Sequence, residues 1–207
     1  MSGWIGCYAV GIGIGFLLCA LRGWNLLWIG VAGALIGLFY TAPPLRLVHR
    51  GLGEIAVAAG FGPIMALGAY FAQAKQYDLE PALASLPVAI LIALVLYVNE
   101  IPDRPADAAA GKRTLPVRLS KTAVVRGYEA AVALAFGLIV LFVAVGVTPW
   151  PTLIALLAAP LALPVRRALW DHYDSPYELM PAMGKNIQLH LATGMLLILG
   201  YVIAIAI

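Results

Sequence analysis

The sequence has little charge. Asp, Glu, Lys and Arg make up 11% of its 207 residues, against about 25% in a typical soluble domain, while 63% are hydrophobic and the mean hydropathy is +0.94. This composition excludes a disordered chain, which needs low hydrophobicity and high charge. Two cysteines are too few for a small secreted module held together by disulfides. The sequence therefore predicts an integral membrane protein.

The sequence also lacks a polar linker, an internal repeat and a soluble domain. We therefore expect a single membrane domain over residues 1–207, built as an all-α polytopic transmembrane bundle. A spanning helix needs about 20 mostly apolar residues, and seven stretches between the charges meet this requirement or nearly do. The predicted spans are 4–21, 24–41, 55–73, 83–99, 124–146, 151–165 and 187–207.

The basic residues are distributed very unevenly between the predicted loops. Seven spans place the N-terminus and the loops 42–54, 100–123 and 166–186 on one side of the membrane, and ten of the 13 Lys and Arg residues lie there. Only Arg22 and Lys75 lie on the other side, and Arg126 falls just inside the fifth span. The positive-inside rule makes the basic side cytoplasmic. The net charge of +3 is thus a topology signal, and we expect no nucleic-acid partner.

One acidic cluster follows the fourth span directly. Asn99, Asp103 and Asp107 are spaced four apart, which places them on one face of a helix with about 5–6 Å between successive Cβ atoms. Two carboxylates so placed suit Mg²⁺ together with the oxygens of a substrate diphosphate, and the cations Lys112 and Arg113 follow nearby. The alternative is a solvated loop that only marks the cytoplasmic side.

Two proline-containing segments shape the surroundings of this cluster. Pro102 is expected to end the fourth span near Ile101, so that the acidic pair opens a new short helix. Between the second and third spans, Pro43 and Pro44 place Arg46 and its neighbour Arg50 at the membrane surface, where an anionic headgroup would dock. Arginines that merely extend from a helix end to the interface are the simpler alternative.

At these two stretches the sequence resembles the UbiA superfamily of intramembrane prenyltransferases, most closely the menaquinone-pathway 1,4-dihydroxy-2-naphthoate polyprenyltransferases. The matching residues are Tyr40-Thr41-Ala42-Pro43-Pro44-Leu45-Arg46 with Arg50-Gly51-Leu52-Gly53-Glu54, and Asn99-Glu100-x-x-Asp103-x-x-x-Asp107 with Gly111-Lys112-Arg113-Thr114-Leu115.

The resemblance implies Mg²⁺-dependent transfer of a polyprenyl group from polyprenyl diphosphate to an aromatic acceptor in the bilayer. Asp103 and Asp107 would bind the metal, and Asn99 would assist as the first polar residue of the motif. Lys112, Arg113 and Arg46 would neutralise the diphosphate. Tyr40 would line the cavity near the reacting carbon. The active-site loops would face the cytoplasm, at an inner or plasma membrane.

The resemblance also implies an absence. The family has about nine spans and a first aspartate-rich motif between its second and third spans, whereas no Asp or Glu precedes Glu54 here. The chain is therefore expected to correspond to the last seven spans and to transfer weakly or not at all by itself.

Two alternatives to this function remain open. The first is a transferase of the same family with another acceptor: 4-hydroxybenzoate, homogentisate, chlorophyllide or a glycerophosphate ether. The second is a non-catalytic membrane subunit or small transporter. A transporter would be expected to show paired halves with interrupted helices, and the sequence shows no such repeat.

Overall fold

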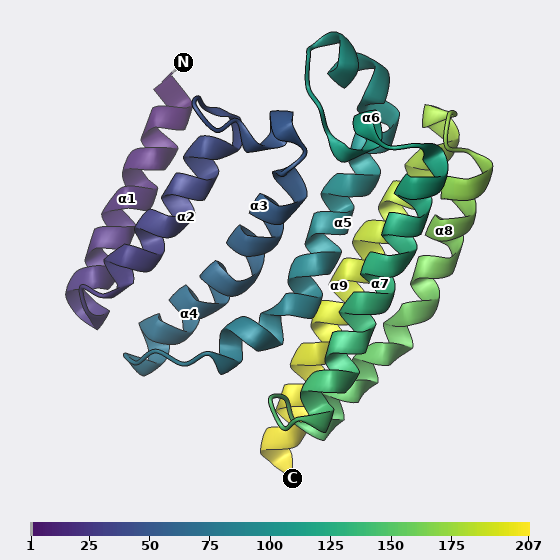
Figure 1. The fold of residues 1–207 in the computed structure, drawn as a ribbon. Helices are drawn as coiled ribbons and strands as arrows, with labels where there is room; N and C mark the ends of the chain where they lie inside the picture. The colour runs from purple at the N-terminus through teal and green to yellow at the C-terminus, as the bar shows by residue number, and fades with distance from the viewer. Residues whose placement is uncertain (1) are drawn as a thin grey trace.

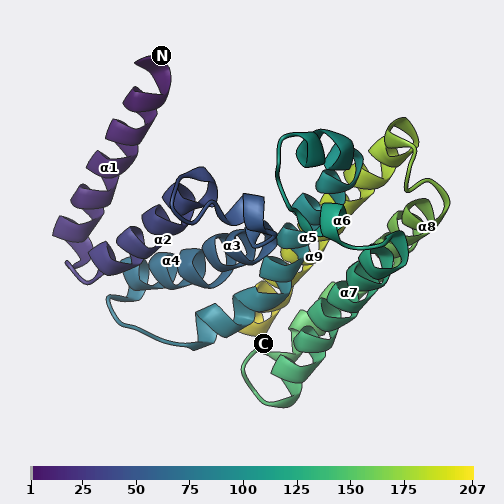
Figure 2. The same ribbon diagram turned by 45° about the horizontal axis from the view of Figure 1, so that its top comes forward.

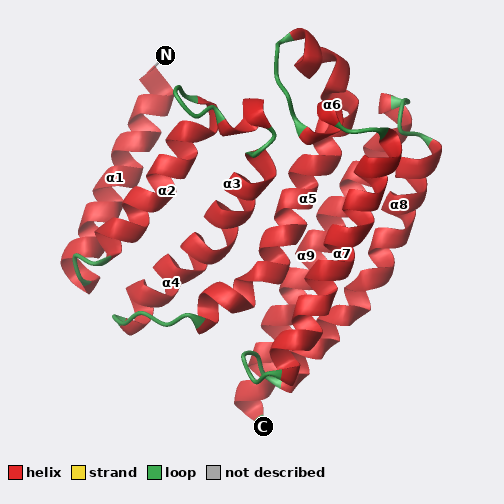
Figure 3. Cartoon of the chain, in the orientation of Figure 1, coloured by secondary structure: helices red, strands yellow, loops and turns green. Residues whose placement is uncertain are grey.

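A computed structural model describes residues 2–207, with side chains from residue 6 onward, and this part of the chain consists of helices joined by loops (Figure 3). In chain order the elements are α1 (Ser2–Arg22), α2 (Leu26–Thr41), the 3₁₀ turn η1 (Leu47–Arg50), α3 (Gly53–Ala59), the π-helical turn η2 (Gly60–Ile64), α4 (Met65–Ala74), α5 (Glu80–Ala109), α6 (Leu115–Arg118), α7 (Lys121–Ala144), the 3₁₀ segment η3 (Trp150–Leu161), α8 (Ala162–Asp171) and α9 (Pro176–Ala206).

The all-α membrane bundle predicted from composition is confirmed. Five continuous helical segments are long and apolar enough to cross a membrane: 53–74, 80–109, 121–144, 150–171 and 176–206. The two shorter apolar helices α1 and α2 precede them. Each of the seven predicted spans therefore coincides with a helix or with consecutive helical segments.

The loops alternate between the two ends of the bundle as predicted. The start of α1, the α2–α3 connection, α6 and the α8–α9 turn share one end, while the C-terminus lies at the other (Figure 1). The loop-borne basic residues therefore gather at the end that carries α6. We call this end the basic end.

Helix α5 continues past the point where the sequence predicted its termination. Pro102 and Pro105 lie inside the helix, which ends only at Ala109, so the expected break near Ile101 and the separate short helix are wrong. Pro105 has no N–H to donate to the carbonyl of Ile101. The Nε–H of Arg104 donates to that carbonyl instead, at 2.9 Å. A side chain thus replaces the missing backbone donor, and the acidic motif stays on the spanning helix.

Two other predicted spans are shorter than the helices that contain them. The sixth span was predicted to end at 165, but α8 carries it to Asp171; α9 begins at Pro176 rather than at 187. The predicted loop 166–186 is consequently only a short turn. Charged residues such as Arg166 and Glu178 lie in the parts of these helices that extend beyond the apolar segments. A count of apolar residues cannot detect such helix ends.

The core lies between α5, α7, η3, α8 and α9. Val98, Ile101, Val124 and Val165 are fully buried there, and α5 packs against α3, η2, α4, α6, α7 and α9. Polar contacts connect the helices within this apolar surrounding. Asn186 on α9 donates to the carbonyl of Leu94 at 2.9 Å and accepts from the hydroxyl of Tyr128 at 3.2 Å.

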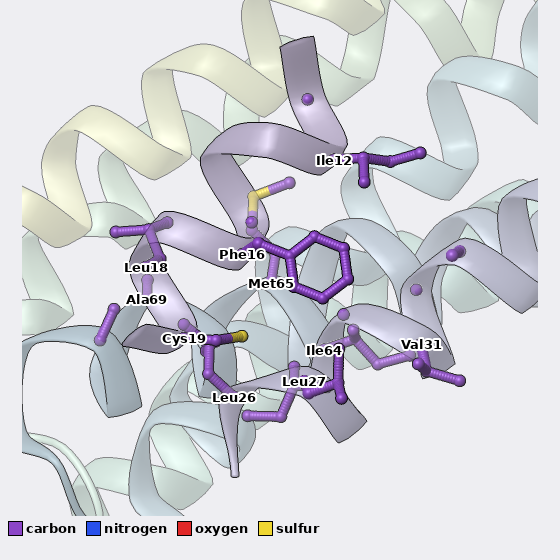
Figure 4. Close-up of a pocket in the computed structure, with 18 of the residues that line it drawn as sticks. Ile12, Phe16, Leu18, Cys19, Leu26, Leu27, Val31, Ile64, Met65 and Ala69 are labelled. Atoms are coloured by element: carbon purple, nitrogen blue, oxygen red, sulfur yellow. The ribbon is translucent and has the colours of Figure 1, made fainter. Parts of the chain in front are cut away.

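Helix α1 is the least packed element. Among the helices that the structure describes it contacts only α2 and α4, and its first turns stand away from the other helices (Figure 2). An apolar cavity of about 820 Å³ lies between these three helices, lined by side chains such as Phe16, Cys19, Ile64 and Met65 (Figure 4).

Glycines on α9 give a test of this packing. A Cβ at Gly200 would lie 2.6 Å from Cα of Thr152 and 2.8 Å from the carbonyl oxygen of Pro151, whereas a Cβ at Gly194 meets nothing within 4 Å. We expect Gly200→Ala to destabilise the protein by about 1–3 kcal/mol through overpacking, and Gly194→Ala to leave stability unchanged or slightly raised, as helix propensity predicts. Thermal unfolding of both variants in detergent measures this. Equal melting temperatures would contradict the close contact between α9 and η3.

Candidate active site

The two sequence motifs come together at the basic end. The backbone N–H of Arg113 donates to the carbonyl of His49 in η1 at 2.9 Å, and Nη1 of Arg118 donates to the carbonyl of Arg50 at 3.2 Å. Gly51 permits this approach, because its φ is +70° and a Cβ there would lie 3.0 Å from the carbonyl oxygen of Arg113. The α2–α3 connection and the segment between α5 and α7 therefore form one polar surface.

The predicted aspartates differ in their surroundings. Asp103 is exposed, whereas Asp107, one turn later on the same helix, is buried and bonded at 2.7 Å to Nζ of Lys112. The hydrogen bond to Asp107 raises the pKa of Lys112. A raised lysine pKa means that the stabilisation from this pair is fully present at neutral pH and is lost only as the pH rises through that value.

The remaining predicted site residues differ in how far they are buried. Asn99 is half-buried on α5, one turn before Asp103. Tyr40, at the end of α2, is half-buried and lines a second apolar cavity of about 490 Å³ between α2, α3 and η2. Arg46 and Arg113 are exposed at the surface, and the structure records no side-chain bond from either one to the acidic residues.

Two carboxylates that the sequence argument did not select lie beside these residues. Glu54 in the first turn of α3 and Glu100 on α5 are 8% and 6% exposed, and their carboxyl groups adjoin each other. Both belong to the quoted motifs, but their spacing from Asp103 and Asp107 gave no sign of a role. The available signal was that each is an acidic residue next to a long apolar segment, which is costly unless it is used.

Arg104 fixes the acidic helix end to the other half of the bundle. Its guanidinium lies 3.9 Å from the centre of the Tyr173 ring, and its Nη2 donates to the Tyr173 carbonyl at 3.2 Å and to the Asp174 carboxylate at 2.7 Å. The same side chain also donates to the carbonyl of Ile101. Arg104 therefore connects the end of α5 to the α8–α9 turn. Asp103 directly precedes this anchor, so the anchor restrains its position.

The donor set limits how a metal could be held. Among the residues that the structure describes, no three Asp, Glu, His or Cys side chains are grouped to enclose an ion. Asp103 and Asp107 on one helical face are two carboxylates at one-turn spacing, which fits an Mg²⁺ ion that keeps waters and takes its other oxygens from a bound phosphate.

Comparison with known proteins gives consistent matches. A family model described as the UbiA prenyltransferase family matches residues 3–180. The chain is 28% identical over 198 residues to a 1,4-dihydroxy-2-naphthoate octaprenyltransferase of Bacillus subtilis, covering 95% of this chain and 63% of that protein. It is 31% identical to a 2-carboxy-1,4-naphthoquinone phytyltransferase of Synechocystis, covering 86% and 58%.

A third relative, a 1,4-dihydroxy-2-naphthoate octaprenyltransferase of Mycobacterium tuberculosis, is 35% identical over 158 residues, with 75% of this chain and 52% of that protein covered. The chain thus spans between about half and two thirds of the length of these three relatives. No solved structure matches it significantly.

The Arg104 contacts predict a stability difference between two arginines. Arg104→Met removes the bonds to Ile101, Tyr173 and Asp174 and leaves the Ile101 carbonyl without its donor, so we expect a loss of about 1–3 kcal/mol. The exposed Arg167 on α8 is the matched control, and Arg167→Met should change stability by less than about 0.5 kcal/mol. Thermal unfolding in detergent checks both. If the two variants unfold alike, Arg104 does not hold the end of α5.

Proposed function

Because the chain belongs to the UbiA prenyltransferase family, we propose that it serves the transfer of a polyprenyl group from a diphosphate to an aromatic acceptor at the basic end of the bundle. The observation that carries this proposal is the Asp103, Asp107 and Lys112 group held against the α2–α3 connection. Since the chain covers only part of its relatives, we assign the transfer to the protein as a whole and the binding of substrate to this chain.

The acidic and basic side chains would have different roles in binding the diphosphate: the acids bind the metal ion, and the bases neutralise negative charge. Asp103 and Asp107, with Asn99 beside them, would hold Mg²⁺ at the diphosphate, and the bound ion would stabilise the negative charge that develops as the allylic C–O bond breaks. Lys112 is already oriented by its bond to Asp107. Arg46 and Arg113 flank the same surface and would add positive charge toward the leaving group.

The two apolar cavities give the prenyl chain a path into the membrane. The cavity beside Tyr40 and the larger one beside α1 share Gly33 and Met65 as lining residues. An apolar chain whose diphosphate lies at the basic end could therefore run past Tyr40 and between α2 and α4. The walls exclude water from the allylic carbon, and the Tyr40 ring would face the developing positive charge.

The acceptor is proposed from the named relatives. Two of them carry 1,4-dihydroxy-2-naphthoate in their names and a third carries a naphthoquinone, so we favour 1,4-dihydroxy-2-naphthoate and a role in menaquinone biosynthesis. The bilayer would be the inner or plasma membrane, with the basic end on the cytoplasmic side by the positive-inside rule.

Substrate binding tests the role of the two aspartates. We expect the chain in lipid nanodiscs to bind a polyprenyl diphosphate only when Mg²⁺ is present, because carboxylates and diphosphate repel each other without the ion. Asp103→Asn and Asp107→Asn should each weaken this binding about tenfold or more. Asp171→Asn, at the exposed end of α8, is the control and should bind like the parent. Mg²⁺-independent binding, or equal affinities in all variants, would show that the two aspartates do not bind the diphosphate through Mg²⁺.

Transfer in membranes tests the acceptor. Membranes containing the chain are given radiolabelled polyprenyl diphosphate and Mg²⁺, with either 1,4-dihydroxy-2-naphthoate or 4-hydroxybenzoate. We expect labelled product from the naphthoate, at a low rate because residues 1–207 contain only one of the two aspartate-rich motifs of the family. If only 4-hydroxybenzoate gives labelled product, then 4-hydroxybenzoate and not 1,4-dihydroxy-2-naphthoate is the acceptor. Diphosphate binding with no transfer to any acceptor would favour a non-catalytic subunit.

A further inference from the structure

Glu54 and Glu100 are buried acids that adjoin each other, and the rest of the described protein gives them few hydrogen-bond donors. Each side chain is more than nine-tenths buried. Apart from the contact between the two carboxyl groups themselves, no group in the described part of the protein donates a hydrogen bond to either carboxylate oxygen of Glu54 or to Oε2 of Glu100. Buried polar atoms are nearly always hydrogen-bonded, and leaving one unpaired is costly. A neighbouring pair of such groups therefore indicates donors that a ligand supplies.

The protein itself has few donors to offer at this place. The hydroxyl of Tyr97, on the same stretch of α5, already donates to the carbonyl of Val124 at 3.0 Å. Nζ of Lys112 donates to Asp107 at 2.7 Å. The Tyr97 hydroxyl is thus committed to another acceptor, and Lys112 is oriented toward Asp107.

The position of the pair relates it to the proposed reaction. Glu54 and Glu100 lie close enough to Tyr40 to interact with it electrostatically, and Tyr40 lines the 490 Å³ apolar cavity. Glu100 also interacts electrostatically with Asp107 and Lys112. The carboxylates therefore neighbour both a residue that lines the apolar cavity and the group proposed to bind the diphosphate.

We propose that Glu54 and Glu100 bind the hydroxyl groups of the aromatic acceptor. This inference rests on the proposed function and names the residues that orient its second substrate. A diphosphate offers only acceptor oxygens and negative charge, so without an intervening cation it cannot satisfy these carboxylates. A hydroxylated aromatic ring offers O–H donors for the carboxylates and a flat apolar face for Tyr40 and the cavity. Glu54 and Glu100 thereby turn the ring toward the end of the prenyl chain that is to be attacked.

The test compares two ligands that differ in whether their two ring oxygens can donate a hydrogen bond, and the Glu variants separate this difference from the added bulk of the methyl groups. The full chain in nanodiscs, under anaerobic conditions, is titrated with 1,4-dihydroxy-2-naphthoate and with 1,4-dimethoxy-2-naphthoate, whose methyl ethers cannot donate. The parent should bind the dihydroxy compound about tenfold or more tightly, as expected for hydrogen bonds to charged acceptors. Glu54→Met and Glu100→Met should each reduce this preference severalfold. Glu54→Gln, which keeps one acceptor oxygen, should fall between the parent and Glu54→Met.

Glu80→Met is the matched control, because Glu80 is exposed at the opposite end of α5, and it should keep the parental preference. Circular dichroism and thermal unfolding establish that each variant is folded. A parent that does not distinguish the two ligands overturns the inference even if the variants fail to fold, as does a preference that survives in Glu54→Met and Glu100→Met.

Mg²⁺-dependent binding of polyprenyl diphosphate, measured on the same samples, separates this inference from the proposed function. If the parent binds the diphosphate but shows no hydroxyl preference, only the acceptor site is wrong. If it binds neither substrate, the proposed function is wrong as well.

Discussion

The continuity of α5 past its two prolines is the constraint on which the site depends. A spanning helix must satisfy its backbone carbonyls internally, and Pro105 cannot supply the donor that Ile101 needs. The Arg104 side chain supplies it and, with the same guanidinium, binds Tyr173 and Asp174 in the α8–α9 turn. Asp103 and Asp107 therefore project from a helix held at its end, instead of from a mobile loop.

The polar chemistry and the apolar space are arranged in sequence along the membrane normal. The basic end collects the aspartates, Lys112 and the exposed arginines, and the two cavities that share Gly33 and Met65 lie along α2, one against α1 and α4 and the other against α3 and η2. An ion and a diphosphate are stabilised by water and by charged side chains, whereas a prenyl chain is stabilised in apolar surroundings. A substrate with both parts fits this division, and Tyr40 lies where the two regions meet.

The sequence predicted the bundle well for a physical reason. Membrane-crossing helices are defined by length and by the absence of charge, so the gaps between charged residues located all seven apolar helical segments and the end at which each loop lies. It failed at helix ends. α5, α8 and α9 extend beyond the apolar segments, because once a helix leaves the hydrocarbon, charged residues no longer oppose its continuation, and contacts such as Arg104 with Ile101 support it.

The sequence by itself determined the membrane class, the order of the apolar helical segments and the face shared by Asn99, Asp103 and Asp107, because these follow from local composition and from helical periodicity. Only the tertiary structure decided that Arg113 bonds to His49, that Arg104 reaches Asp174 and that Glu54 adjoins Glu100. These partners are far apart in the chain, and their pairing depends on how α3, α5 and the α8–α9 turn pack. No spacing rule encodes that packing, so the pairing of these two buried carboxylates became visible only when the helices were assembled.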